Sequence, residues 1–153
     1  MGVQGLFPLL LSKLPNAANS SHVSLYGRTV AIDASVCFYQ IAHARNSGGQ
    51  HIWGVWQKAI GLLHRGVTPV FVFDGKAPVE KSRQPGAQAI RFQWEHDAKR
   101  LLKLMGLPFV QAPGEAEAQC AELVKGGKCW AVITEDSDVF AFGCPRLLRQ
   151  LHL

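Results

Sequence analysis

Short apolar runs and stretches with helical periodicity follow one another along this chain. The apolar runs are rich in β-branched and aromatic residues, and they predict buried strands at residues 29–33, 69–74, 107–110 and 129–133. Apolar residues spaced three and four apart predict helices at residues 4–14, 36–45, 52–65 and 90–105, and one more around Glu115 and Glu117. Residues 145–151 allow a further strand.

This alternation indicates an α/β fold, with a mostly parallel central sheet flanked by helices on both faces. The helix at residues 52–65 is apolar nearly all round, so we expect it in the core. We assign the Trp and Phe residues to packing because they occur at core spacing. Residues 75–87 are interrupted by Gly and Pro and predict a loop. With 153 residues, the chain has the size of one ordinary domain.

Acidic residues follow the carboxyl ends of the predicted strands. Ligands of parallel sheets bind outside these ends, so we expect the acids at one edge of one sheet. The six candidates are Asp33, Asp74, Glu115, Glu117, Asp136 and Asp138.

Each of these acids also has an ordinary explanation. Asp33 is suited to cap the next helix, and Asp74 with Gly75 is typical of a turn. Acids in a first helical turn, such as Glu115, favour the helix dipole, and a surface turn accounts nearly as well for residues 136–138. The combination favours a shared site, because four independent explanations would otherwise have to coincide at one edge.

The six carboxylates predict a cation site. Asp136 and Asp138 are expected on the same side of an extended segment, which suits a shared metal ion. Hard oxygen ligands favour Mg²⁺ or Mn²⁺ over zinc, and metals held by carboxylates most often meet phosphate oxygens.

The charge balance supports a polyanionic partner. The formal net charge is +5, and the six candidate acids are more than half of the eleven acidic residues, against sixteen Lys and Arg. A basic body around an acidic pocket suits a protein that binds a polyanion through a metal. A soluble domain with a solvated basic surface is the plainer alternative.

The sequence lacks the motifs of several other protein classes. The four cysteines show no Cys-x-x-Cys spacing, which indicates buried reduced thiols, and Cys120 is expected in the core rather than as a nucleophile. No phosphate-binding glycine motif or Gly-x-Ser-x-Gly elbow is present. No run reaches membrane-spanning length, and the interrupted apolar stretch from Leu6 argues against secretion and for an intracellular protein. Arg28 is the single arginine before Asp33, which leaves a mitochondrial presequence as a weak alternative.

Five stretches resemble one known family. They are Met1-Gly-Val-Gln-Gly-Leu, Ile32-Asp-Ala-Ser with Tyr39-Gln40, Val72-Phe-Asp-Gly-Lys, Ala112-Pro-Gly-Glu-Ala-Glu-Ala-Gln and Thr134-Glu-Asp-Ser-Asp. In order, they look like the amino-terminal and internal blocks of flap endonucleases, which are XPG-type structure-specific 5′ nucleases. The resemblance implies a PIN-like 5′-nuclease core at residues 1–153, with nuclease regions at residues 1–81 and 94–153.

The resemblance assigns roles to individual residues. It implies that the six acids are catalytic and hold two Mg²⁺ ions, with Mn²⁺ as an alternative. It places Gly2 beside the active site, Lys81 at the scissile phosphate and Tyr39 in a stack near it, where a plain core or rim tyrosine is the simpler alternative. Arg83 is a candidate for a second basic residue that contacts DNA.

The implied function is hydrolysis of DNA phosphodiesters, as a metal-dependent endonuclease and 5′-3′ exonuclease that cuts 5′ flaps near single-strand/duplex junctions. The resemblance further implies a nuclear protein of DNA replication and repair. One alternative is a catalytically impaired fragment that binds nucleic acid. Another is a PIN-like metal-dependent ribonuclease.

The chain also departs from the family pattern. Where the family has a long helical arch, residues 82–93 form a shortened segment. After the position of Leu153 the family continues to a seventh acid, a hairpin that grips duplex DNA and a tail that binds a sliding clamp. The resemblance therefore implies weaker binding of one metal and of duplex DNA by residues 1–153 alone.

Overall fold

The computed structural model of the protein describes residues 5–14, 24–35, 37–38, 50–75 and 85–149. The helices are α1 (Leu6–Lys13), α3 (Gln50–Leu63), α4 (Pro85–Leu104), α5 (Ala116–Lys125) and the 3₁₀ helix η3 (Asp138–Phe140). The strands are β1 (Thr29–Asp33), β2 (Thr68–Phe73), β3 (Phe109–Gln111), β4 (Ala131–Ile133) and β5 (Leu147–Leu148). The predicted α/β fold is confirmed.

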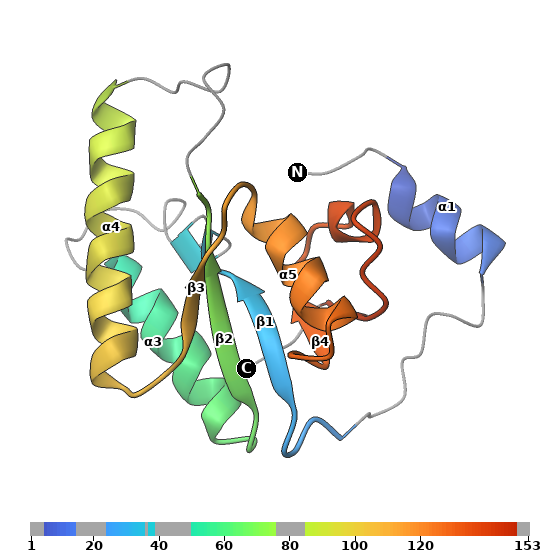
Figure 1. Ribbon diagram of the computed structural model, residues 1–153, viewed down its shortest axis with the longest axis horizontal. Coiled ribbons are helices and arrows are strands. Elements are labelled where there is room, and N and C mark those ends of the chain that lie inside the picture. Colours follow the sequence, from blue (N-terminus) through green and yellow to red (C-terminus); the bar gives the residue numbers. More distant parts are fainter. Residues whose placement is uncertain (1–4, 15–23, 36, 39–49, 76–84, 150–153) are drawn as a thin grey trace.

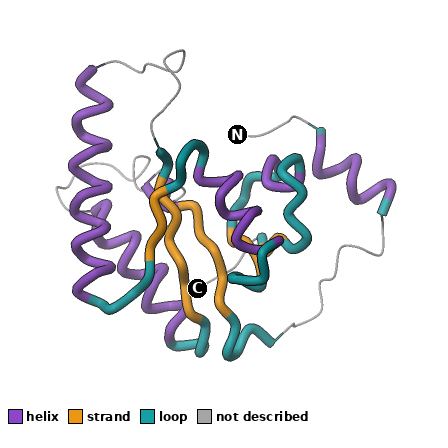
Figure 2. The backbone as a smooth tube through the Cα atoms, in the orientation of Figure 1, coloured by secondary structure: helices purple, strands orange, loops and turns teal. Residues whose placement is uncertain are grey.

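The five strands form one parallel sheet in the order β3-β2-β1-β4-β5. The chain builds outward from β1 to β3, then crosses back to add β4 on the other side of β1. This reversal puts α3 and α4 on one face of the sheet and α5 on the other (Figure 1). The backbone trace shows the strands between these two layers of helices (Figure 2). All strands therefore end at one edge of the sheet. Ligands of such sheets are expected at this edge, where the strand order reverses between β1 and β4.

Alternate residues of each strand enter two separate cores. In β1, Val30 and Ile32 face α3 and α4, whereas Ala31 faces α5. In β2, Phe71 and Phe73 enter the first core and Val72 the second. Continuing the same alternation, Asp33 at the end of β1 falls on the α5 side, together with Ala31.

The predicted strands agree with the observed ones within two residues at each end, with one exception at the carboxyl side. There the expected strand at residues 145–151 is the two-residue strand β5. The predicted loop at residues 75–87 is wrong at its end, because α4 begins at Pro85. Proline is favoured at a first helical position, where its missing N–H costs nothing. Most of the helix predicted at residues 36–45 lies outside the described residues.

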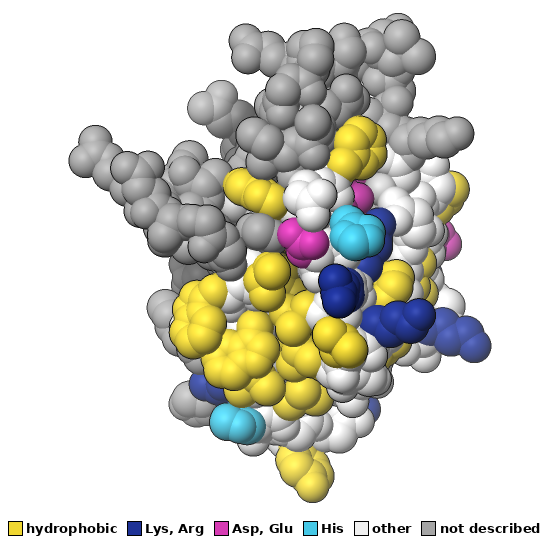
Figure 3. All heavy atoms as spheres, turned by 90° about the vertical axis from the view of Figure 1, so that its left-hand side faces the viewer, with side chains coloured by type: hydrophobic (Ala, Val, Ile, Leu, Met, Phe, Trp, Pro, Cys, Tyr) yellow, Lys and Arg dark blue, Asp and Glu magenta, His cyan; other side chains and the backbone are white. Residues whose placement is uncertain are grey.

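The assignment of all Trp and Phe residues to packing is also wrong. Val55, Ala59 and Leu62 fill the buried face of α3, so its two tryptophans lie on the outside. Trp53 is 55% exposed and Trp56 is 37% exposed, and their rings stack at 4.8 Å. Phe92 on α4 is 64% exposed. Figure 3 views this side of the molecule and shows apolar side chains gathered on the surface, with Lys and Arg side chains beside them.

The cysteine prediction is confirmed. Cys37, Cys120, Cys129 and Cys144 are buried free thiols. Burial raises the pKa of the Cys120 thiol, which keeps it protonated and suits a core residue better than a nucleophile. Within the described ranges, no helix is both long enough and apolar enough to cross a membrane.

Candidate functional site

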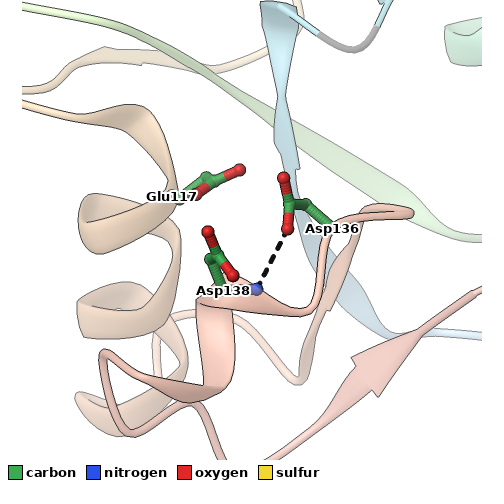
Figure 4. A group of neighbouring side chains, drawn as sticks. All are labelled: Glu117, Asp136 and Asp138. Atoms are coloured by element: carbon green, nitrogen blue, oxygen red, sulfur yellow. Dashed lines mark hydrogen bonds between the residues drawn. The ribbon is translucent and has the colours of Figure 1, made fainter. Parts of the chain in front are cut away.

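Three acids meet at the carboxyl edge of the sheet. Glu117 projects from the first turn of α5, and Asp136 and Asp138 come from the turn after β4. One carboxylate oxygen from each lies within 4.8 Å of the others. Figure 4 shows the three side chains pointing toward one another. This spacing is suited to a single cation that all three oxygens contact.

The turn after β4 orients two of these acids through backbone bonds. The N–H of Asp136 donates to Thr134 Oγ1 at 3.1 Å, and the N–H of Asp138 donates to Asp136 Oδ1 at 3.1 Å. The expected extended segment is therefore wrong, because Asp138 begins the 3₁₀ helix η3. The two carboxylates still converge, since the tight turn brings positions 136 and 138 to the same side.

Asp33 and Asp74 are fixed in a similar way at neighbouring strand ends. Asp33 Oδ1 accepts the N–H of Ser35 at 2.8 Å, so the capping role that the sequence allows for this residue is real. Asp74 Oδ1 accepts the N–H of Ala116 at 2.8 Å and thereby caps α5. Each carboxylate is anchored by one oxygen and held at the site edge.

Burial and the neighbouring acids make Glu117 harder to ionise. Burial, followed by the negative charges of Asp136, Asp33, Asp138 and Glu115, raises the pKa of Glu117 from 4.5 to about 7. Asp33 is thus electrostatically part of the cluster that contains Glu117. A bound cation would relieve this repulsion, and the all-oxygen donor set fits Mg²⁺ or Mn²⁺.

Glu115 stands apart from the three-acid cluster. It is the N-cap residue of α5, with extended backbone and an exposed side chain. Residues two apart do not share a helix face, so α5 directs Glu117 inward and leaves Glu115 at its rim. The remaining candidates Gly2, Tyr39, Lys81 and Arg83 lie outside the described residues.

Small residues allow the chain to close tightly around the site. A Cβ atom on Gly75 would lie 2.3 Å from the carbonyl oxygen of Ala112 and 2.6 Å from that of Pro113, which no side chain tolerates. The N–H of Gly75 donates to the carbonyl of Gly114 at 2.7 Å. Glycine is therefore required at position 75, where the segment after β2 presses against the segment that leads into α5.

The sequence patterns do not single out Thr134, Gly75 or Gln111 as site residues. A threonine two residues before an acid is a known turn signal, so the local sequence around Thr134 is enough to predict this turn. Gln111 had no such signal. Its Nε2 atom donates to the carbonyl oxygen of Asp74, a contact that only the pairing of β2 with β3 creates.

The sequence matches two family descriptions. Residues 1–92 match the XPG N-terminal domain and residues 106–152 match the XPG I-region. Flap endonuclease 1 of Drosophila ananassae is 40% identical over 194 aligned residues, which cover 99% of this chain and 50% of that protein. This chain thus spans about half the length of the curated relatives that it matches.

Solved structures agree with these matches. The catalytic core of Rad2 in complex with DNA substrate is 35% identical, with a TM-score of 0.78, over 94% of this chain and 49% of that chain. The Holliday junction-resolving enzyme GEN1, in complex with product DNA and Mg²⁺, is 31% identical, with a TM-score of 0.63. That match covers 94% of this chain and 31% of the GEN1 chain.

Proposed function

We propose, from the premise that this chain belongs to the XPG family, that residues 1–153 form the catalytic core of a metal-dependent, structure-specific 5′ nuclease. The substrate would be DNA with a 5′ flap or another single-strand/duplex junction, and the reaction hydrolysis of a phosphodiester bond. The observation that carries the proposal is the convergence of Glu117, Asp136 and Asp138 at the carboxyl edge of a parallel sheet.

The acids would act as metal ligands. Glu117, Asp136 and Asp138 would hold one Mg²⁺ ion, and Asp33 and Asp74 lie at adjacent strand ends, where a second ion would require ligands. Bound Mg²⁺ supplies Lewis acidity at a phosphate and makes water a better nucleophile. The backbone bonds to Asp33, Asp74 and Asp136 keep the ligands in place before any ion arrives, which reduces the reorganisation that binding requires.

The basic residues would supply the DNA contacts. By family resemblance, we assign Lys81 to the scissile phosphate, Tyr39 to stacking and Gly2 to a place beside the site, with Arg83 as the candidate for a second basic residue that contacts DNA. The excess of sixteen Lys and Arg over five acids outside the candidate site supports binding of a polyanion.

Charge removal at one ligand tests the proposal. Asp136→Asn keeps an oxygen that accepts the N–H of Asp138 but removes the negative charge, so Mg²⁺-dependent cleavage of a 5′-flap DNA should fall by at least about 100-fold. Glu135→Gln is the matched control, because Glu135 is adjacent, 53% exposed and faces Arg149 rather than the cluster. Cleavage by Asp136→Asn at the wild-type rate would overturn the proposal.

A second candidate function is DNA binding without turnover. The alignment with the Drosophila relative spans 194 positions although this chain has 153 residues, so the relative carries insertions that this chain lacks. We place the main difference at residues 82–93, where the family has its arch. This function predicts salt-dependent binding of flap DNA with no cleavage at any concentration of Mg²⁺ or Mn²⁺.

The cellular setting is a further part of the proposal. The relatives are DNA-processing enzymes by name, which supports a nuclear protein of replication and repair. A sliding clamp is an expected partner of longer family members, through a tail that follows the region aligned with residues 1–153. Imaging of a tagged protein in intact cells would test the nuclear location.

A further inference from the structure

A polar chain connects helix α4 with the end of β2. Lys99 Nζ on α4 donates to Gln111 Oε1 at 2.6 Å, and Gln111 Nε2 donates to the backbone carbonyl oxygen of Asp74. An ammonium group only donates and a carbonyl oxygen only accepts, so the two partners fix which end of the amide faces which. Gln111 therefore bridges the two groups in one defined orientation.

Lys99 is itself held firmly. Its Nζ lies 3.5 Å from Glu95 Oε2, one helical turn earlier on α4, and Glu95 is 9% exposed. The same Nζ lies 4.7 Å from the centre of the Phe73 ring, which immediately precedes Asp74. The ammonium group is thus fixed relative to both α4 and the last residue of β2.

On the other side of the sheet, Asp74 is fixed to α5. Its carboxylate caps α5 at the N–H of Ala116, the residue before Glu117. The next peptide, at Gly75, bonds to Gly114 at 2.7 Å with no room for a side chain. The carbonyl of Asp74 faces Gln111 while its carboxylate faces α5, so one residue connects the two layers.

We propose that Gln111, oriented by Lys99, is a positioning residue for the acidic site. By bonding to the carbonyl of Asp74 it sets the backbone there, and through the cap at Ala116 it places the first turn of α5, which carries Glu117. This inference rests on the proposed function, in which these acids hold a metal ion. Gln111 does not touch the metal or the substrate itself.

The test is metal affinity without DNA. Gln111→Met keeps the length of the side chain and removes both hydrogen bonds, so its Kd for Mn²⁺, measured by electron paramagnetic resonance, should rise about 10-fold. Lys99→Met should raise the Kd in the same direction by a smaller factor, because Gln111 remains but loses its orienting partner. Gln111→Met should keep a melting temperature close to wild type, since Gln111 is exposed.

Gln93→Met is the matched control. Gln93 lies on α4, as Lys99 does, and donates to the half-buried Asp97 at 3.0 Å, but this bond does not lead to the site. Its Kd for Mn²⁺ should equal that of wild type.

The outcomes separate the two proposals. Equal Mn²⁺ affinity of Gln111→Met and wild type would overturn the positioning role, whereas loss of binding in Asp136→Asn would still support the metal site. A weaker affinity in Gln111→Met that comes with a melting temperature more than about 5 °C lower would assign the residue to folding and also overturn the role. No Mn²⁺ binding by wild type would overturn both proposals.

Discussion

The two faces of the sheet are built from side chains of different size. Under α3 and α4, the strands contribute Phe71, Phe73 and Ile32, which are among the largest fully buried side chains. Under α5, the core is filled mainly by small residues: Ala31, Ala112, Ala116, Cys120, Ala121, Cys129 and Cys144, with a few valines. The three acids of the candidate metal site meet at the carboxyl edge, and Glu117 among them is carried by α5 on this second face.

This difference in size has a functional consequence. Small side chains let α5 pack close to the strands, so that Asp74 reaches the N–H of Ala116 and Glu117 reaches the acids after β4. The face under α3 and α4, which we call the bulky face, buries more apolar surface per residue and contributes more to the free energy of folding. Stability and the candidate chemistry are therefore expected to respond to substitutions on different faces.

Truncation on the bulky face should have the largest effect. Phe71→Ala removes a fully buried ring and should lower the free energy of unfolding by about 3–5 kcal/mol, measured by urea denaturation. Phe92→Ala is the control, because the same change at a 64% exposed ring should cost less than about 0.5 kcal/mol. Similar losses in both variants would contradict the assignment of the bulky face as the main source of stability.

Enlarging a side chain on the face under α5, which we call the small-residue face, should have an intermediate effect. Ala121 is fully buried on the side of α5 that faces the sheet, so Ala121→Leu should push the helix outward and cost about 1–3 kcal/mol. Unlike Phe71→Ala, it should also weaken Mn²⁺ binding, because α5 carries Glu117. Ala118→Leu, at a half-buried position of the same helix, is the control and should change both quantities less. Unchanged Mn²⁺ affinity in Ala121→Leu would contradict the link between tight packing and the site.

Much of this arrangement follows from local sequence patterns. Continuous apolar runs identify buried parallel strands, and acids directly after them identify the edge where a site forms, because both signals are local. The sequence does not distinguish the two faces, because Val30 and Ala31 are both apolar. Which core each side chain enters is decided by the pairing of β1 with its neighbouring strands.

The sequence predictions that are wrong concern features that three-dimensional packing decides. Trp53 and Trp56 are large apolar residues of the kind that usually fill a core. They are nevertheless on the surface, because the sheet can cover only one side of α3. The position of Asp138 depends on a tight turn held by Asp136, which extended-strand spacing does not anticipate. The bridge from Lys99 through Gln111 to Asp74 joins three segments, so no single stretch of sequence contains it.

The smallest expected effect concerns the charge on the small-residue face. The pKa of Glu117 is 4.5 in the unfolded chain and about 7 in the fold without metal. The folded state therefore binds this proton more tightly, and its contribution to stability is full below about pH 4.5 and lost as pH rises through about 7. Because solvent reaches this half-buried carboxylate, the loss should be about 1–2 kcal/mol rather than the full value of the shift.

Glu117→Gln isolates this contribution, because glutamine resembles the protonated acid and does not titrate. The difference in unfolding free energy between wild type and Glu117→Gln should be near zero at pH 4, below both pKa values, and should favour the variant at pH 8 without metal. Adding Mg²⁺ at pH 8 should reverse the sign, since a bound cation stabilises the charged form and only wild type offers it a third carboxylate. A difference that stays constant from pH 4 to 8 would show that the fold does not raise the pKa of Glu117, and the small-residue face would then differ from the bulky one in packing alone.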